Sequence, residues 1–344
     1  MIKTNTVYQI EKFYEGMKKY WHPVCSFKKL KYKKIIPIQL LGEQIVILFL
    51  QGETAALLDV CKHYQAQLSL GKIDKFKGND CIRCPYHGWA YDRFGKCIDI
   101  PQINKKISKN IKVPSYQTCE KYGIVWVCLD HNSKSEIPDL PEYDDGNYRK
   151  INFFEKETTK TNVLRMIMGT LDNTHFPWVH GGILGSKGKI NQSKNNCNFE
   201  NNYLKVIYSI EQPNNLVTFD QSDELIEKSK SVNIKYTNYV TINTIRLVKS
   251  GPSGNYSIWL SSCPNTFNES TNFWIFSRNY DKSPKKDKDY LDLAKTVRLQ
   301  DKVVIESQTP KLLIPFNSKI GIPIMSSDKP IIEYQKWIEK LGII

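Results

Sequence analysis

The chain has 344 residues, of which 40% are hydrophobic and 24% charged, and its formal net charge is +14. This length is sufficient for about two domains. The longest apolar run, Ile45–Leu50, is too short to cross a bilayer, and the N-terminal residues lack the apolar core of a signal peptide. We therefore expect a soluble protein with no membrane partner.

The positive charge comes from lysines spread along the whole chain, which favours a solvated surface. The basic run Lys28–Lys34 stands alone, with no recognisable nucleic-acid module, so no nucleic-acid partner is predicted. The alternative role of the charge is to steer an acidic electron donor or an anionic substrate. Nine irregularly spaced cysteines do not form a disulfide framework, which indicates a reducing, cytoplasmic compartment.

Short β-rich runs alternate with Gly, Asp and Asn turns between residues 20 and 130. This pattern predicts an all-β domain. The runs are Ile36–Leu41, Gln44–Leu50, Ala55–Val60 and Ile124–Leu129.

Two loops between these strands carry metal-binding residue types: Cys61 with His63, and Cys84 with His87. Two thiolates and two imidazoles suit a [2Fe–2S] cluster with Cys on one iron and His on the other. A structural zinc site is the alternative. Zinc-finger spacings group the cysteines together, whereas here each Cys precedes its own His, and the pair Cys81–Cys84 has no second Cys pair.

The segments Leu68–Gly71 and Pro85–Trp89 resemble a Rieske ferredoxin domain. The stretch between the two ligand pairs is a few residues longer than is usual in that domain. The additional residues, Lys72–Asp80, are polar and predict an enlarged surface turn.

A proline-punctuated linker, Ile137–Pro141, divides the chain into predicted domains 1–140 and 141–344. The second domain is predicted as α+β. It has a helix over Thr161–Asp172, strands over Leu204–Ile210, Ser231–Val248, Tyr256–Ser262 and Asn272–Tyr280, and a long helix over Asp287–Ser307.

The first of these helices leads into a second group of metal-binding residue types. Asp172 and His175 are three apart and share a helix face. Pro177 is expected to end the helix at Phe176, so that His180 turns back beside His175. Two imidazoles and one carboxylate form the facial triad of non-haem Fe(II) oxygenases, which leaves positions open for O₂. The alternative is ordinary polar residues at a helix end, as we expect for His22 and His131 elsewhere.

The third ligand of such a triad is expected from the long helix. Asp301 falls in the middle of its apolar stripe, whereas Asp292 lies on the opposite face. A carboxylate facing a core is costly unless it is paired or binds a metal. The alternative is an ion pair with Arg165 or Arg298. The stripe consists of Tyr290, Leu293, Ala294, Val297, Val304 and Ile305.

The motif Asp172-x₂-His175-x₄-His180, downstream of the Rieske-like segments, resembles the α-subunit of Rieske non-haem iron oxygenases over nearly the whole chain. Pro138–Tyr148 and Gln300–Pro310 are most similar to the single-subunit hydroxylases of cyanobacterial saxitoxin biosynthesis. The resemblance implies a helix-grip catalytic domain, with Asp301 as an iron ligand. It also implies a head-to-tail homotrimer in which Asp172 links a neighbour's His87 to His175. Gly169 stands where the family usually has Asn, which puts the rate or the coupling in doubt.

The resemblance implies a monooxygenase or dioxygenase that hydroxylates or O/N-demethylates a small organic molecule, with a guanidinium alkaloid as one candidate. No GxGxxG fingerprint is present, so electrons from NAD(P)H would arrive through a separate ferredoxin or flavin reductase. The alternative is an electron-transfer or sensory protein with an inactive catalytic domain, which only Gly169 favours.

Overall fold

The computed structural model describes residues 6–154, 158–186, 194–215, 217, 231–315 and 323–344. The chain forms two compact units. The N-terminal unit comprises Tyr14–Ile137 and Cys263–Phe267, and the C-terminal unit comprises Pro138–Ser262, Asn268–Ile344 and the segment through Phe13. Relative to the predicted division between residues 140 and 141, the segment through Phe13 therefore belongs to the C-terminal unit and Cys263–Phe267 to the N-terminal unit. None of the described helices has the length and apolar character needed to cross a membrane.

The N-terminal unit contains a six-stranded sheet of order β1-β10-β9-β4-β3-β2. The four predicted runs in this region are strands of this sheet, each within two residues of its expected bounds. The strands are β1 (His22–Ser26), β2 (Ile35–Leu40), β3 (Glu43–Leu50), β4 (Glu53–Leu58), β9 (Ser115–Lys121) and β10 (Ile124–Cys128). Helix α2 (Phe27–Lys33) follows β1, and helix α1 (Val7–Met17) precedes it.

A four-stranded antiparallel sheet, in the order β5-β6-β7-β8, completes this unit. The surface turn predicted over Lys72–Asp80 is wrong, because β5 (Lys72–Phe76) pairs with β6 (Asn79–Arg83) as a hairpin. Lys77 and Gly78 have left-handed φ values of 49° and 84°, as a tight two-residue hairpin turn requires. The interleaved lysines hid the strand pattern. The other two strands are β7 (Ala90–Tyr91) and β8 (Cys97–Asp99).

The C-terminal unit is built on a seven-stranded antiparallel sheet of order β11-β17-β16-β15-β14-β13-β12. The single strand predicted over Ser231–Val248 is wrong: the chain reverses after Val240, and Thr241 donates its N–H to the Thr244 carbonyl. Both arms of the hairpin are β-rich, so the pattern did not reveal the turn. The strands are β11 (Arg149–Phe154), β12 (Asn196–Glu200), β13 (Tyr203–Pro213), β14 (Ser231–Val240), β15 (Thr244–Gly251), β16 (Gly254–Thr266) and β17 (Glu269–Arg278).

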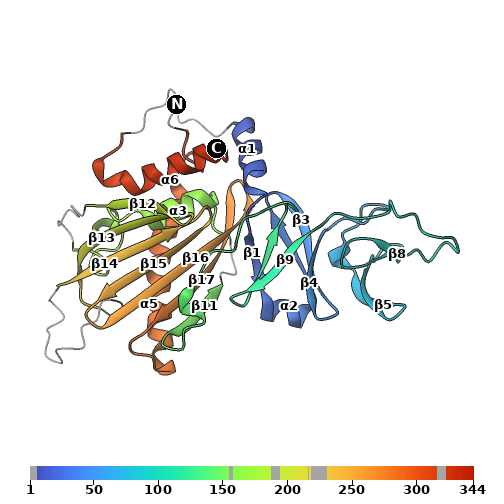
Figure 1. The fold of residues 1–344 in the computed structure, drawn as a ribbon, viewed down its shortest axis with the longest axis horizontal. Helices are drawn as coiled ribbons and strands as arrows, with labels where there is room; N and C mark the ends of the chain where they lie inside the picture. The colour runs from blue at the N-terminus through green and yellow to red at the C-terminus, as the bar shows by residue number, and fades with distance from the viewer. Residues whose placement is uncertain (1–5, 155–157, 187–193, 216, 218–230, 316–322) are drawn as a thin grey trace. The chain divides into compact units, whose positions relative to one another are not determined.

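Helix α5 (Asp287–Ser307) has the predicted bounds and runs along one face of this sheet (Figure 1). Leu293, Ala294 and Val297 face the sheet across a cavity. Val304, predicted to lie on the same stripe, is instead 44% exposed. The other helices of this unit are α3 (Val163–Leu171), α4 (Phe176–Val179) and α6 (Lys329–Lys340).

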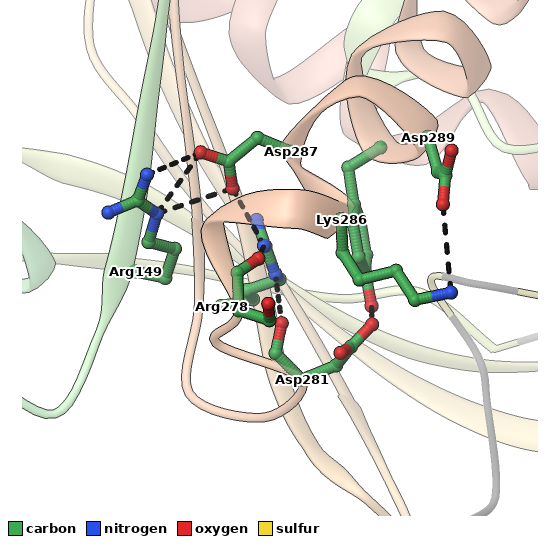
Figure 2. Close-up of polar contacts among 8 residues, drawn as sticks. Arg149, Arg278, Asp281, Lys286, Asp287 and Asp289 are labelled. Carbon is green, nitrogen blue, oxygen red and sulfur yellow. Dashed lines mark hydrogen bonds and ion pairs between the residues drawn. The ribbon is translucent and has the colours of Figure 1, made fainter.

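The first residue of α5, Asp287, anchors the helix to the sheet (Figure 2). Its carboxylate accepts hydrogen bonds from Arg149 Nε at 3.1 and 3.2 Å and from Arg278 Nη2 at 2.8 Å. Arg149 on β11 and Arg278 on β17 are directly opposite each other in the sheet. Arg278 is only 1% exposed, and its guanidinium also lies 4.1 Å from the centre of the Tyr290 ring. The anchor fixes the position of Asp301, about four helical turns further on.

We expect Asp287→Asn to lower the free energy of unfolding by about 3 kcal/mol, because the buried Arg278 guanidinium would lose its only carboxylate partner among the described residues. Asp289→Asn is the matched control. It removes the same charge two residues further along the helix, where the 3.7 Å pair with Lys286 is half-exposed, and should cost less than about 1 kcal/mol. Urea denaturation followed by circular dichroism measures both. Equal losses would contradict the anchoring role.

Candidate metal centres and the adjoining cavity

Two loops of the N-terminal unit carry the first set of predicted ligands. Cys61 follows β4 and Cys84 follows β6, and both thiols are buried, at 1% and 3% exposure. Each loop is closed by a backbone hydrogen bond of 2.8 Å, from Cys61 to the Ala66 carbonyl and from Cys84 to the Trp89 carbonyl. The loops therefore hold their cysteines inward while their histidines lie toward the surface.

The two imidazoles of these loops meet at one edge. His63 Nδ1 lies 3.1 Å from His87 Nδ1, and the His63 ring stacks on Trp89 with centroids 4.7 Å apart and an interplanar angle of 5°. Cys61 Sγ lies 3.2 Å from the Tyr91 hydroxyl. Two inward thiols and two imidazoles with converging Nδ1 atoms fit a [2Fe–2S] cluster with mixed ligands. Cys81 takes no part, because its thiol donates to the Asp74 carbonyl within the hairpin.

Arg83 supports the second loop in a way that the sequence did not indicate. Its guanidinium bonds Asp74 at 2.6 Å, Asp99 at 2.8 Å and the Gly88 carbonyl. These partners lie on β5, on β8 and in the loop itself, so only the folded sheet brings them together. Gly88 has a φ of 76°, which favours glycine at this position.

The second set of predicted ligands begins where α3 ends. The helix predicted to continue to Phe176 is wrong: α3 stops at Leu171, and Asp172 is extended, with a ψ of 135°. Asp172 accepts hydrogen bonds from the backbone and hydroxyl of Thr174 at 2.8 and 2.7 Å. Pro177 lies in the first turn of the new helix α4 rather than at the end of the old one, because proline lacks the N–H that is unsatisfied there anyway.

Helix α4 brings the two histidines together. His175 precedes its first residue and His180 follows its last, and their ring centroids are 5.1 Å apart. His175 Nδ1 contacts Asp172 at 3.2 Å, and His180 Nδ1 contacts Gln300 Oε1 at 2.8 Å. Because both Nδ1 atoms face acceptors, each Nε2 is left as the atom with a free lone pair.

Asp301 of α5 faces both of these Nε2 atoms. Its Oδ1 lies 2.8 Å from His180 Nε2 and 3.4 Å from His175 Nε2. The three donor atoms lie within 4.8 Å of one another. In the part of the chain that the structure describes, Asp301 forms no ion pair with Arg165 or Arg298.

A divalent cation fits this cluster. His180 Nε2 is buried and has no hydrogen-bond partner among the described residues, although Asp301 Oδ1 lies 2.8 Å away. Burial by itself would lower the pKa of His175, but Asp172 and Asp301 outweigh it and raise that pKa to about 9. The two carboxylates thus favour a positive charge at this point, where a metal ion would replace the proton of His175, and two histidines with one carboxylate are the ligand set of non-haem Fe(II).

Two neighbouring residues explain the arrangement further. Gln300 orients His180 as Asp172 orients His175, a role that becomes visible only once α5 lies beside α4. Gly169 is where α3 and α5 come close: a Cβ there would lie 2.8 Å from Ile305 Cδ1. Ile305 therefore fills the space of the Asn expected at that position.

A cavity opens onto the triad from the space between the sheet and α5. It encloses about 770 Å³ of empty space, its mouth included. Its walls are mostly apolar and aromatic, and Asp301 is the one carboxylate among the described residues that line it. The aromatic residues of the wall are Phe176, Tyr236, Tyr256, Trp274 and Phe276.

Comparisons with protein families agree with both halves of the chain. Residues 20–117 match the Rieske [2Fe-2S] domain. Residues 160–342, more than half of the chain, match the C-terminal domain of vanillate O-demethylase oxygenase. These matches include the two sets of predicted ligands, one in each domain.

Two similar proteins come from Pseudomonas putida. The methylxanthine N3-demethylase NdmB is 28% identical over 334 residues, which cover 95% of this chain and 90% of that protein. The structure of NdmA with caffeine superposes with a TM-score of 0.80 at 27% identity, covering 96% of this chain and 92% of that one. Dicamba monooxygenase, at 19% identity and a TM-score of 0.75, shares the fold. The expected similarity to saxitoxin hydroxylases is wrong in this respect, since two relatives that each cover 95% of the chain are methylxanthine demethylases.

We expect His87→Ala to abolish the visible and EPR spectrum of the [2Fe–2S] cluster, because a cluster held by four side chains on two loops cannot lose one of them. Cys81→Ser is the matched control. It changes a buried thiol close to the second loop that contacts only the hairpin carbonyl, so the spectrum should stay the same. An unchanged spectrum in His87→Ala would overturn the ligand assignment.

We expect Asp301→Ala to keep the cluster spectrum but to hold no mononuclear iron, because the two imidazoles would lose their carboxylate partner. The control is Asp292→Ala, on the same helix, whose side chain is 54% exposed and pairs only with Lys295 among the described residues. Iron and sulfide analysis of both purified variants makes the measurement. Full iron occupancy in Asp301→Ala would assign the third ligand to another acid.

Proposed function

We propose that this chain, which belongs to the Rieske oxygenases with a C-terminal domain of the vanillate O-demethylase type, oxidatively removes a methyl group from nitrogen or oxygen of a small planar substrate. The observation that carries the proposal is the triad of His175, His180 and Asp301 at the wall of an aromatic cavity. The names of its family and of its methylxanthine relatives favour demethylation over ring dihydroxylation.

The overall reaction consumes one O₂, two electrons and two protons for each methyl group. A substrate N–CH₃ becomes N–H, and the carbon leaves as formaldehyde with one molecule of water. When bound, the cluster supplies single electrons and the mononuclear iron supplies the activation of O₂. The electrons come from NAD(P)H through a separate reductase or ferredoxin.

The protein's own residues position the substrate and exclude water. Flat aromatic walls from β14, β16 and β17 suit a planar ring system. Asp172 and Gln300 contact the Nδ1 atoms of the two imidazoles and fix their orientation, so the triad keeps its geometry while the substrate reacts. The methyl group would face Asp301 and the two histidines.

Asp172 is also our candidate for the electron route. One of its oxygens contacts His175, and its side chain is 25% exposed, so an approaching imidazole has access to it. In a head-to-tail homotrimer that imidazole would be His87 of a neighbouring copy. We expect such a trimer and a cytoplasmic location.

An electron carrier with an inactive catalytic domain is the competing function. Gly169 was its only support, and the side chain of Ile305 now accounts for that position. The two functions differ in iron content: an oxygenase holds three irons per chain when loaded, and a carrier holds two.

The decisive experiment incubates the iron-loaded protein with a reductase, NADH and a panel of methylxanthines and methoxybenzoates. A demethylase releases one formaldehyde for each O₂ consumed above the substrate-free rate. If protein that holds three irons per chain releases no formaldehyde from any compound of the panel, demethylation of these two substrate classes is rejected.

We expect Asp172→Asn to retain both metals but to turn over about 10- to 100-fold more slowly, because the amide neither orients His175 as well nor carries the charge. Asp292→Asn makes the same substitution at an exposed position and should turn over normally. Formaldehyde release per iron measures both. Normal turnover in Asp172→Asn would contradict the proposed electron route.

A further inference from the structure

A lysine lies in the wall of the substrate cavity with no role in the triad. Lys249, on β15, is only 5% exposed and lines the cavity. It is directly opposite Tyr236 on β14 and Tyr256 on β16, so its alkyl chain lies between two tyrosines of the neighbouring strands. Its ammonium lies 5.3 Å from the centre of the Tyr236 ring.

Lys249 has no anionic partner within the protein as far as the structure describes it. No ion pair or hydrogen bond links its ammonium to any of the described residues. Burial lowers the pKa of Lys249 to about 7, with no charged neighbour to offset it. An unpaired buried amine is costly, and an apolar side chain of similar length would fill the same wall at less cost.

The charges around the cavity favour an anion there. Lys249 lines it, and the one carboxylate among its described lining residues, Asp301, faces the two histidines. A cationic molecule such as a guanidinium alkaloid would meet the Lys249 ammonium, with no free acid among the described lining residues to pair with it. A negatively charged oxygen would instead pair with Lys249 and keep it protonated.

We propose that Lys249 binds an anionic oxygen group of a planar aromatic substrate and thereby selects anions over neutral molecules of the same shape. The inference rests on the proposed function for the identity of the cavity as the substrate site. Two chemistries supply such an oxygen: a ring carboxylate, and the ionised oxygen of a purine-like ring. Tyr236 and Tyr256 beside the ammonium, with Trp274 and Phe276 from β17, provide the flat apolar wall for the ring.

The test compares matched anionic and neutral probes in binding measurements that need no turnover. The carboxylate pair is 4-methoxybenzoate with 4-methoxybenzamide, and the purine pair is the 1,3-dimethylurate anion with caffeine. Calorimetric titration of the oxidised holoprotein gives each dissociation constant. We expect the anion of at least one pair to bind at least tenfold more tightly than its neutral partner. The pair that shows the difference identifies the oxygen chemistry.

Lys249→Met keeps the length of the side chain and removes its charge. It should abolish that difference, because the affinity for the anion falls at least tenfold while the affinity for the neutral probe is unchanged. Lys249→Gln, which keeps a neutral hydrogen-bond donor, should lower the affinity for the anion to a similar extent. Lys235→Met is the matched control, because Lys235 lies on β14 next to Tyr236 but is exposed on the other face. An unchanged circular dichroism spectrum and unchanged binding of the mononuclear iron verify folding of each variant.

Three results would overturn the inference: equal affinity for both members of each pair, no binding of any probe, or an anion preference that survives in Lys249→Met. The first and third results can occur while formaldehyde is still released from caffeine, and the second while it is released from another substrate of the panel; demethylation then stands and only the role of Lys249 is rejected. Conversely, a Lys249-dependent anion preference without formaldehyde release would reject demethylation alone.

Discussion

The ion pairs of Asp287 with Arg149 and Arg278 decide where helix α5 lies, and the rest of the C-terminal unit depends on that position. The helix contributes Asp301 to the triad, Gln300 as the partner of His180, and one wall of the cavity. Since an α-helix is stiff over its 21 residues, fixing its first residue against two strands fixes the carboxylate at the far end as well. The anchor is strong because the Arg278 guanidinium is buried and cannot exchange its partner for water.

The triad itself is assembled from two parts of the chain that meet only in the folded unit. A helix of one turn, α4, holds His175 and His180 at its two ends, and α5 supplies the acid. The Nδ1 atom of each imidazole contacts a neighbouring side chain, Asp172 or Gln300, so both Nε2 atoms face Asp301. A buried nitrogen without a hydrogen bond beside a carboxylate is an expensive arrangement in an apolar wall unless a cation binds there.

The two walls of the cavity differ in the residues that they carry. The helical side carries the triad, where a methyl group would react, and the sheet side carries aromatic rings with a single lysine among them. Strand alternation places Leu247 and Lys249 on the same face of β15. A substrate held on the sheet side would therefore present its far edge to the triad, so orientation and reaction are controlled by different elements.

Much of what the sequence determined follows from the spacing of residues that lie close together in the chain. Cys61 with His63, Cys84 with His87 and His175 with His180 are local pairs whose chemistry is visible without a fold, and Asp301 stood out because helical periodicity put an acid on an apolar stripe. Features that join distant segments could not be seen in this way. The break at Asp172, the 72–83 hairpin and the partners of Asp287 depend on contacts across strands and helices. Lys249 is the clearest case: alternation places it on one face of a strand, but only the packing of α5 over that face decides that the lysine is buried in the wall of a cavity rather than exposed to water.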